Sequence, residues 1–445
     1  MDTPICDFVR QYAADAPLRL HMPGHKGHGP LGVEALDITE VEGADVLYQP
    51  TGIIRRSQEN AAALFGTAKT VYSTEGSSLC IRGMVCLASL YAKSVGRPPV
   101  IAAGRNAHRV FMTAAALLDV TVDWLMPAEG DSLLSCTVTG DTLEAYLAAA
   151  EPKPVAVYIT SPDYLGNRAD IAALATVCHR HDVLLLVDNA HGAYLHFLPK
   201  PCHPLDEGAD LCCDSAHKTL GVLTGGAYLH IGKDAPALLA QQATEAMALF
   251  ASTSPSYLIL QSLDAANPRL AGDYPAHLAA CTTRLDALKA TLTHAGWPLI
   301  GNEPLKLTLA PKIYGYTGEQ LAAQLAEQHI HCECSDPDYV VCMVTPEGGD
   351  EAIDRLEAAL LAIPAREPIR TLPPPLPLPK RRLSPRQALL SPGEELPVEA
   401  CIGRILATPA VSCPPAVPIA VCGEVITEET VALLTYYGIT HCRVI

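Results

Sequence analysis

One lysine is the first residue of this chain whose surroundings suggest chemistry. The stretch CCDSAHKTLGVLTGG, residues 212–226, places Lys218 behind a serine and a histidine and ahead of an uncharged, glycine-bearing run. An ammonium held in apolar surroundings has a lowered pKa and can act as a nucleophile toward an aldehyde. Considered alone, Lys218 could also be a solvated loop lysine, so its neighbours in the fold must decide.

A carboxylate and a glycine turn accompany this lysine. In LLLVDNAHG an apolar strand leads directly into Asp188, and a carboxylate there loses hydration unless it meets a cation or a hydrogen-bond donor. In STEGSSLC, Gly76 with Ser77 and Ser78 joins a strand to a helix, where backbone N–H groups can hold a phosphate. The alternative for this turn is a serine that only caps the helix. No Gly-Lys-Ser/Thr follows, so the turn is not a Walker A loop.

Together the three groups describe a pyridoxal phosphate site. The turn would anchor the phosphate, Asp188 would keep the ring nitrogen protonated, and Lys218 would capture the aldehyde as a Schiff base. Such a site needs all three groups at one edge of a sheet. The carboxyl ends of parallel strands provide that edge.

The hydrophobic pattern predicts the required sheet. From about Ser57 helical and strand patterns alternate, and the pattern continues through the segments SQENAAALFG, TVYST, SSLCIRGMVCLASLYA, PPVIAA, VAVYITS, DIAALATVCHRHD, VLLLVDNAHG and GGAYLHIG. This alternation indicates an α/β fold with a parallel sheet covered on both faces. Further segments, LKLTLAP, TGEQLAAQLAEQHI and YVVCMV, predict a smaller α/β domain.

Changes in pattern and composition suggest five parts. These are an N-terminal arm bordering the site (residues 1–55), a large domain (56–265), a small α/β domain (266–365), a proline-rich linker (366–385) and a C-terminal segment (386–445). The arm holds HMPGHKGHGPLG, which is rich in turn formers.

The composition excludes several classes of partner. The 445 residues include 31 basic and 48 acidic ones, giving a formal net charge of −17, which argues against a nucleic-acid partner. The start does not have the pattern of a signal peptide, and no window is apolar enough for a membrane span. Sixteen scattered cysteines without an export signal predict reduced thiols and a cytoplasmic protein.

Beyond these physical arguments, the sequence resembles the Orn/Lys/Arg decarboxylases. The resemblance is carried by the motifs HMPGHKG, GIIRRSQENAAALFG, GRNAHRV, TSPDYLG, VDNAHGAYLHF, SAHKTLGVLTGGAYLH, TSPSYLILQSLDAA and CPPAVPIAVCGEVITEE, which occur in the family's order. It implies a fold type I pyridoxal phosphate enzyme with a mostly parallel seven-stranded sheet, a small α/β domain and a short C-terminal domain. It also implies a homodimer, or an assembly of dimers, with the active site at the interface.

The same resemblance implies roles for individual residues. Lys218 would be the Schiff-base lysine, Asp188 the partner of the pyridinium nitrogen and His217 a proton donor. The remaining cofactor-binding residues would be Ala190 beneath the ring, His108 stacked on its other face, His191, Gly76, Ser77, Ser78 and Ser215 around the phosphate, and Thr253 and Ser254 reaching it from the partner subunit.

Some positions depart from the family pattern. EGS replaces the common Asn-Gly-Thr and places Glu75 near the proposed phosphate site, DNAHG replaces Asp-Glu-Ala-His-Gly, and Arg109 replaces a common lysine. The chain also starts at the HMPGHKG region, without the amino-terminal wing domain of longer members. Large rings of dimers built on that wing are therefore not expected.

The implied reaction is decarboxylation of a basic amino acid through an external aldimine and a quinonoid. Arginine and lysine are the first candidates, then ornithine, and the product would be agmatine or a diamine. Substrate contacts could come from His25 and from Glu333 and Asp336, although the last two could also lie on an exposed strand end. Another pyridoxal phosphate reaction, such as transamination or elimination, and a non-catalytic regulatory role remain as alternatives.

Two histidine-rich stretches also contain metal-ligand types. HIHCEC, residues 329–334, lacks a second cluster with finger-like spacing, and HMPGHKGHG borders the predicted site. We therefore predict no metal. Whether the amine product would serve polyamine synthesis or acid resistance is open at this level.

Overall fold

A computed structural model describes residues 1–128, 130–377, 380–409 and 416–445. The family-like motif CPPAVPIAVCGEVITEE begins at residue 413, so its first three residues lie outside the described part. The α-helices are α1 (Pro4–Ala14), α2 (Ile53–Phe65), α3 (Gly76–Ser94), α4 (Arg109–Leu118), α5 (Gly140–Ala149), α6 (Ile171–Arg180), α7 (Ala216–Thr219), α8 (Ala237–Ala248), α9 (Tyr257–Ala271), α10 (Tyr274–His294), α11 (Gly318–Glu327), α12 (Gly349–Ala362), α13 (Pro385–Leu389) and α14 (Glu428–Tyr436).

The strands are β1 (Lys69–Ser73), β2 (Val100–Gly104), β3 (Thr121–Leu125), β4 (Ala156–Thr160), β5 (Leu184–Asp188), β6 (Leu211–Asp214), β7 (Ala227–Ile231), β8 (Leu299–Ile300), β9 (Lys306–Leu309), β10 (Cys334–Ser335), β11 (Val340–Met343), β12 (Glu394–Pro397) and β13 (His441–Val444). Short 3-10 helices are η1 (Glu34–Leu36), η2 (Ala193–Phe197), η3 (Pro311–Tyr314), η4 (Pro346–Gly348) and η5 (Val398–Cys401). No helix in the described ranges has the length and apolar character needed to cross a membrane.

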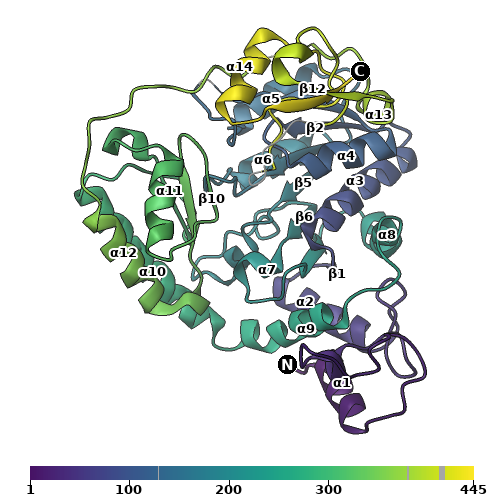
Figure 1. Cartoon of the computed structure of the whole chain (residues 1–445). Coiled ribbons are helices and arrows are strands. Elements are labelled where there is room, and N and C mark those ends of the chain that lie inside the picture. Colours follow the sequence, from purple (N-terminus) through teal and green to yellow (C-terminus); the bar gives the residue numbers. More distant parts are fainter. Residues whose placement is uncertain (129, 378–379, 410–415) are drawn as a thin grey trace. The chain divides into compact units, whose positions relative to one another are not determined.

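A seven-stranded sheet, in the order β1-β7-β6-β5-β4-β2-β3, confirms the predicted α/β fold (Figure 1). β5 runs parallel to β6, and β2 runs parallel to β3. β7 is antiparallel to both β1 and β6, so the sheet is mostly parallel. Every residue of β5, β6 and β7 is buried, as expected for strands covered on both faces.

The chain divides into two compact units. The first comprises residues 1–98, 155–157 and 171–277, and the second comprises residues 99–154, 158–170 and 278–445. In the first unit α3 packs against α8 and against β6 and β7, while α1 packs against α2 and α9 (Figure 1). The five-part division from the sequence stays a prediction.

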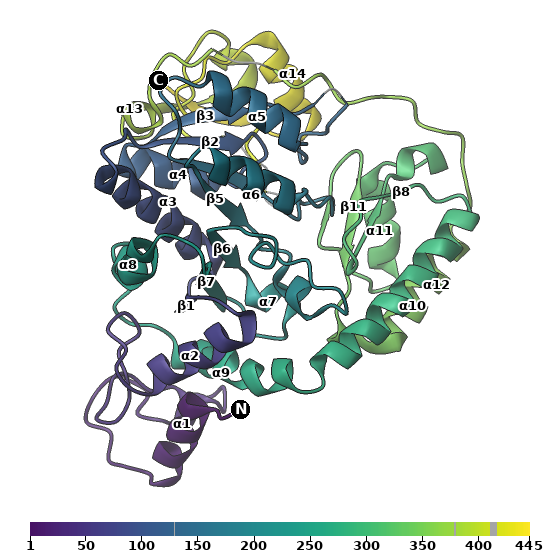
Figure 2. The ribbon, with the colours of Figure 1, turned by 180° about the vertical axis from the view of Figure 1, so that it is seen from behind.

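The second unit contains two smaller sheets. One has the order β10-β11-β9-β8, and α11 packs against it (Figure 2). The other pairs β12 with β13 near the C-terminus. Around that pair the C-terminal segment builds its own hydrophobic cluster, which includes Val398, Cys401, Leu406, Ile419, Ile426, Leu433 and Val444.

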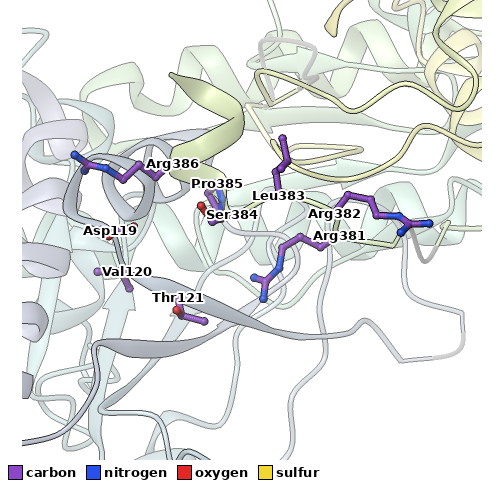
Figure 3. Close-up of a pocket in the computed structure, with 9 residues that line it drawn as sticks. All are labelled: Asp119, Val120, Thr121, Arg381, Arg382, Leu383, Ser384, Pro385 and Arg386. Carbon is purple, nitrogen blue, oxygen red and sulfur yellow. The ribbon is translucent and has the colours of Figure 1, made fainter. Parts of the chain in front are cut away.

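Arginines at the junction of the proline-rich linker and the C-terminal segment fasten this part of the chain within the second unit (Figure 3). Arg381 Nη1 donates to the Val122 carbonyl (3.0 Å) and Arg386 Nη1 donates to the Leu117 carbonyl (2.7 Å). These arginines and Arg382 line a cavity of about 220 Å³, yet their guanidinium groups point in different directions (Figure 3). They attach the segment to α4 and β3 rather than converge on one ligand.

Candidate active site

Lys218 lies just beyond the carboxyl end of β6. Ser215 follows the strand, and Lys218 is the third residue of the short helix α7. Its Nζ lies 2.9 Å from Nε2 of His191, which follows the neighbouring parallel strand β5 and is 5% exposed. The amine and the imidazole therefore meet at the sheet edge where parallel strands present ligand sites.

Asp188 is the last residue of β5 and is 3% exposed. The parallel register places it beside Cys213, whose thiol donates to Asp188 Oδ1 (3.4 Å). The backbone N–H of Ala190 donates to the same oxygen (3.2 Å). The carboxylate is thus held in one orientation by donors, which is what a partner for a ring nitrogen requires.

The glycine turn and Ser215 come together as a pair of hydroxyls. Ser215 Oγ donates to Ser77 Oγ (2.8 Å), although the two residues are far apart in sequence. Gly76 begins α3 with φ +71°, a conformation that favours glycine, and its N–H donates to the Gly225 carbonyl. Ser77 and Ser78 lie in the first turn of α3, where unpaired backbone N–H groups attract an anion.

The N-cap of this helix is Glu75, not a serine. Its side chain makes no capping hydrogen bond, and Oε1 instead accepts the backbone N–H of Ser252 (2.8 Å). Simple helix capping therefore does not explain the serines. The same contact fastens the loop that carries Thr253 and Ser254, both of which are exposed in the single chain.

His217 is held by Gly226, the residue just before β7. Its Nδ1 lies 3.0 Å from the Gly226 carbonyl, and its backbone N–H donates to the same oxygen. Because a carbonyl only accepts hydrogen bonds, Nδ1 carries a proton, and Nε2 is the nitrogen that a neutral ring leaves unprotonated. This fixed tautomer suits a residue that exchanges a proton with a ligand.

A buried polar network missed by sequence reasoning lies behind the site. Asp214, at the end of β6, contacts Nε2 of His203 (2.9 Å) and Nε2 of His230 (3.3 Å) and accepts from Asn189 Nδ2 (2.7 Å). All four side chains are buried. Asn189 follows Asp188 directly, so the network braces the loop that begins after Asp188 at the end of β5.

Burial alone would raise the pKa of Asp214, but His203 and His230 hold it well below its ordinary value. Desolvation conversely lowers the pKa of His230. His203, Cys212 and Asp214 also form a group of metal-ligand types. However, Nδ1 of His203 faces the Leu205 N–H (3.3 Å), so the proton lies on Nε2 and points to Asp214. The hydrogen-bonded network accounts for these contacts.

The other predicted residues lie elsewhere. In the N-terminal arm, His25 Nε2 pairs with Asp37 (3.1 Å) and Nδ1 accepts the Gly27 N–H. In the second unit, His108 is the N-cap of α4 and its Nδ1 accepts the Val110 N–H (3.2 Å).

Glu333 and Asp336 flank β10 of the small sheet in the second unit. Asp336 Oδ1 accepts the backbone N–H groups of Asp338 and Tyr339, both at 2.7 Å. Desolvation raises the pKa of Asp336 to about 6 despite these hydrogen bonds. The Glu333 N–H donates to the Val341 carbonyl of β11, next to the pairing of β10 with β11. The HIHCEC stretch is mostly not a strand, because β10 begins only at Cys334.

Comparison with known proteins decides the family. A model described as the Orn/Lys/Arg decarboxylase major domain matches residues 3–297. The chain belongs to the Orn/Lys/Arg decarboxylase family. It is 31% identical to an arginine decarboxylase of Bacillus subtilis, covering 97% of this chain and 93% of that protein. It is 32% identical to an arginine decarboxylase of Halalkalibacterium halodurans, covering 97% and 92%.

Solved structures of family members share the fold. A lysine decarboxylase of Francisella novicida aligns over 100% of this chain and 81% of its own, with a TM-score of 0.79 and 18% identity. A constitutive lysine decarboxylase of E. coli aligns over 100% and 82%, with a TM-score of 0.75 and 19% identity. The fold is that of the fold type I pyridoxal phosphate enzymes, and the chain is a pyridoxal phosphate-dependent decarboxylase.

The first unit fits this cofactor. The paired hydroxyls of Ser77 and Ser215 lie at a helix N-terminus suited to a phosphate, Asp188 presents a buried carboxylate, and Lys218 supplies an amine beside them. All are in one compact unit.

Proposed function

We propose that this enzyme decarboxylates arginine in preference to lysine and ornithine and that it works as a cytoplasmic homodimer. One observation carries the catalytic part: Lys218 Nζ lies 2.9 Å from His191 at the same sheet edge as the buried Asp188. The arginine preference is supported by the full-length relatives described as arginine decarboxylases.

Each site residue has a proposed task toward the cofactor. Ser77, Ser78 and Ser215 hold the phosphate, Lys218 binds the aldehyde carbon and Asp188 keeps the ring nitrogen protonated. When bound, pyridoxal phosphate supplies a sink for the electron pair left on Cα after CO2 departs. Ala190, His191 and His108 pack on the ring, and Thr253 and Ser254 extend to the phosphate of the partner subunit.

The remaining tasks concern protons and the substrate side chain. Lys218 and His217 are the proposed groups that return a proton to Cα, and the Gly226 carbonyl holds the His217 ring in one orientation. We assign Asp336, with Glu333 and His25, to recognition of the basic substrate. Desolvation raises the pKa of Asp336 to about 6. A distal guanidinium or ammonium of the substrate would stabilise the ionised form of this carboxylate.

The experiment combines an absorption spectrum with product analysis. The purified enzyme should show a band near roughly 420 nm that Lys218→Ala removes, whereas the exposed control Lys200→Ala should retain it. Arginine, lysine and ornithine are then supplied separately while CO2 and keto acids are measured. CO2 chiefly from arginine supports the proposal. Keto acid without CO2 would reassign the reaction to transamination, and a cofactor band without turnover would indicate a regulatory protein.

A further inference from the structure

Two cysteines face each other in the small sheet of the second unit. β10 pairs antiparallel with β11, with Cys334 opposite Val341, and this pairing brings the residues just before β10 beside β11. As a result Cys332 Sγ lies 3.6 Å from Cys342 Sγ, and the Cys342 thiol donates to the Cys332 sulfur. The proposed decarboxylation assigns no task to either sulfur.

The two thiols differ in their readiness to ionise. The hydrogen bond from Cys342 lowers the pKa of Cys332 although burial opposes it, while the same bond and burial raise the pKa of Cys342 well above its ordinary value. The thiolate is the reactive form of cysteine, so Cys332 is the nucleophile of the pair. Cys332 is also partly exposed, whereas Cys342 is 7% exposed.

Within the described ranges, the other cysteines with a shifted pKa are all shifted upward, chiefly by burial. The neighbouring Cys334 shows the contrast. It packs in a cluster with Leu134, Leu165 and Val341, and burial raises its pKa to about 12. Geometry and chemistry therefore single out Cys332 and Cys342.

The distance suits a disulfide. A disulfide bond needs sulfur atoms about 2.0 Å apart, so the present 3.6 Å separation must shorten by roughly 1.6 Å. Rotation about the side-chain torsions of a partly exposed cysteine can supply a movement of this size. The strand pairing that brings the two residues together can stay in place.

We propose that Cys332 and Cys342 form a reversible disulfide when the protein meets a peroxide. The Cys332 thiolate attacks one peroxide oxygen, the O–O bond breaks, and the leaving hydroxide takes a proton to become water, which gives a sulfenic acid. The Cys342 sulfur then attacks the Cys332 sulfur, the S–O bond breaks and a second water leaves. Two thiols are oxidised by two electrons while hydrogen peroxide is reduced to two waters.

Peroxide treatment followed by peptide mapping tests this proposal independently of the proposed decarboxylation. The reduced full-length protein is treated with a small excess of hydrogen peroxide, and its remaining thiols are then blocked by alkylation. It is finally digested with a protease that cuts before aspartate. Cuts before Asp336 and Asp338 separate Cys332 from Cys342. Mass spectrometry should then find the two peptides joined with the loss of two hydrogens, and a reductant should separate them.

Matched variants make the assignment specific. Cys334→Ser should form the link at the wild-type rate, whereas Cys332→Ser and Cys342→Ser should abolish it, and Cys342→Ser should accumulate a sulfenic acid at Cys332. In the folded protein Cys332 should react about tenfold or more faster than Cys334, a preference that urea should remove. A link between Cys332 and Cys334, or over-oxidised Cys332 with Cys342 still alkylated, would overturn the proposal. So would two thiols that both stay reduced.

Discussion

Replacing Asp336 by asparagine tests the electrostatics of the small sheet and the proposed substrate contact together. Desolvation raises the pKa of Asp336 from 3.8 to about 6, although its Oδ1 accepts two backbone N–H groups at 2.7 Å. Asparagine keeps an oxygen acceptor for those N–H groups and removes only the charge. The substitution therefore isolates the free energy of this partly buried charge.

The direction in which stability changes with pH follows from the order in which the unfolded and folded states lose the Asp336 proton. Between pH 3.8 and about 6 the unfolded state has already lost this proton while the folded state keeps it, so stability falls as the pH rises through this interval. Each step of one in pKa corresponds to about 1.4 kcal/mol, so the ionised carboxylate costs up to about 3 kcal/mol above pH 6. Asp336→Asn should be more stable than wild type by up to that amount near neutral pH and equally stable near about pH 3.5.

Urea unfolding across the pH range measures this difference. The control Glu319→Gln removes an exposed nearby charge and should change stability by less than about 0.5 kcal/mol at every pH. Parallel stability curves for wild type and Asp336→Asn would refute the burial argument. Kinetics test the second role separately: loss of a charge-assisted contact should lower kcat/KM for arginine by about 10–100-fold, and an unchanged kcat/KM would remove Asp336 from the substrate site.

Four further substitutions test the site and its supports. Ser215→Ala should weaken pyridoxal phosphate binding by about tenfold or more, measured by equilibrium dialysis, because it removes a proposed phosphate donor, the hydroxyl that pairs with Ser77. Asp214→Asn should destabilise the protein near neutral pH by about 3–5 kcal/mol. Because His203 and His230 hold the pKa of Asp214 low, its stabilising effect is present above about pH 4 and should fade in acid, so the curves of wild type and variant converge there. Arg105→Met should lower the free energy of unfolding by about 3–5 kcal/mol, measured with denaturant, because it leaves the Glu424 carboxylate buried without its partner. Adding Glu424→Leu to this variant should restore much of the lost stability.

The local pattern predicted the strands well. Apolar runs such as VLLLVD and VAVYITS correspond to β5 and β4, and the glycine that ends SQENAAALFG is Gly66, which follows α2 in a left-handed conformation. These features depend on neighbours within a few residues, which periodicity and turn chemistry report directly. The rule that parallel strands share one edge placed Asp188 and Lys218 at the same edge of the sheet, where Lys218 lies beside His191.

Pairing between distant segments was harder to predict. Nothing in the pattern of β7 shows that it runs antiparallel to both β1 and β6. The Asp214 network was missed because its histidines come from two separate segments, and no local pattern links either of them to Asp214. A carboxylate at the end of the apolar run LCCD was the one available signal, since such a group needs buried partners.

The C-terminal segment shows why some site residues could be assigned only by resemblance. His108 lies between two anchors, both made to that segment. The Arg105 guanidinium, 8% exposed, donates to the carbonyls of Pro418 (3.1 Å) and Ile419 (3.2 Å) and pairs with Glu424 (3.2 Å). Four residues later the Arg109 N–H donates to the Ala416 carbonyl (2.9 Å).

Residues far along the chain thus determine the conformation of the loop that carries His108. A buried guanidinium without these carbonyls and the carboxylate would be strongly unfavourable, so the loop and the C-terminal segment must form together. The segment is therefore a structural support for a proposed cofactor residue, and it packs around its own hydrophobic cluster. Because the pairing spans more than three hundred residues, no local pattern could have revealed it, although both partner motifs, GRNAHRV and PIAVCGE, were visible from the start.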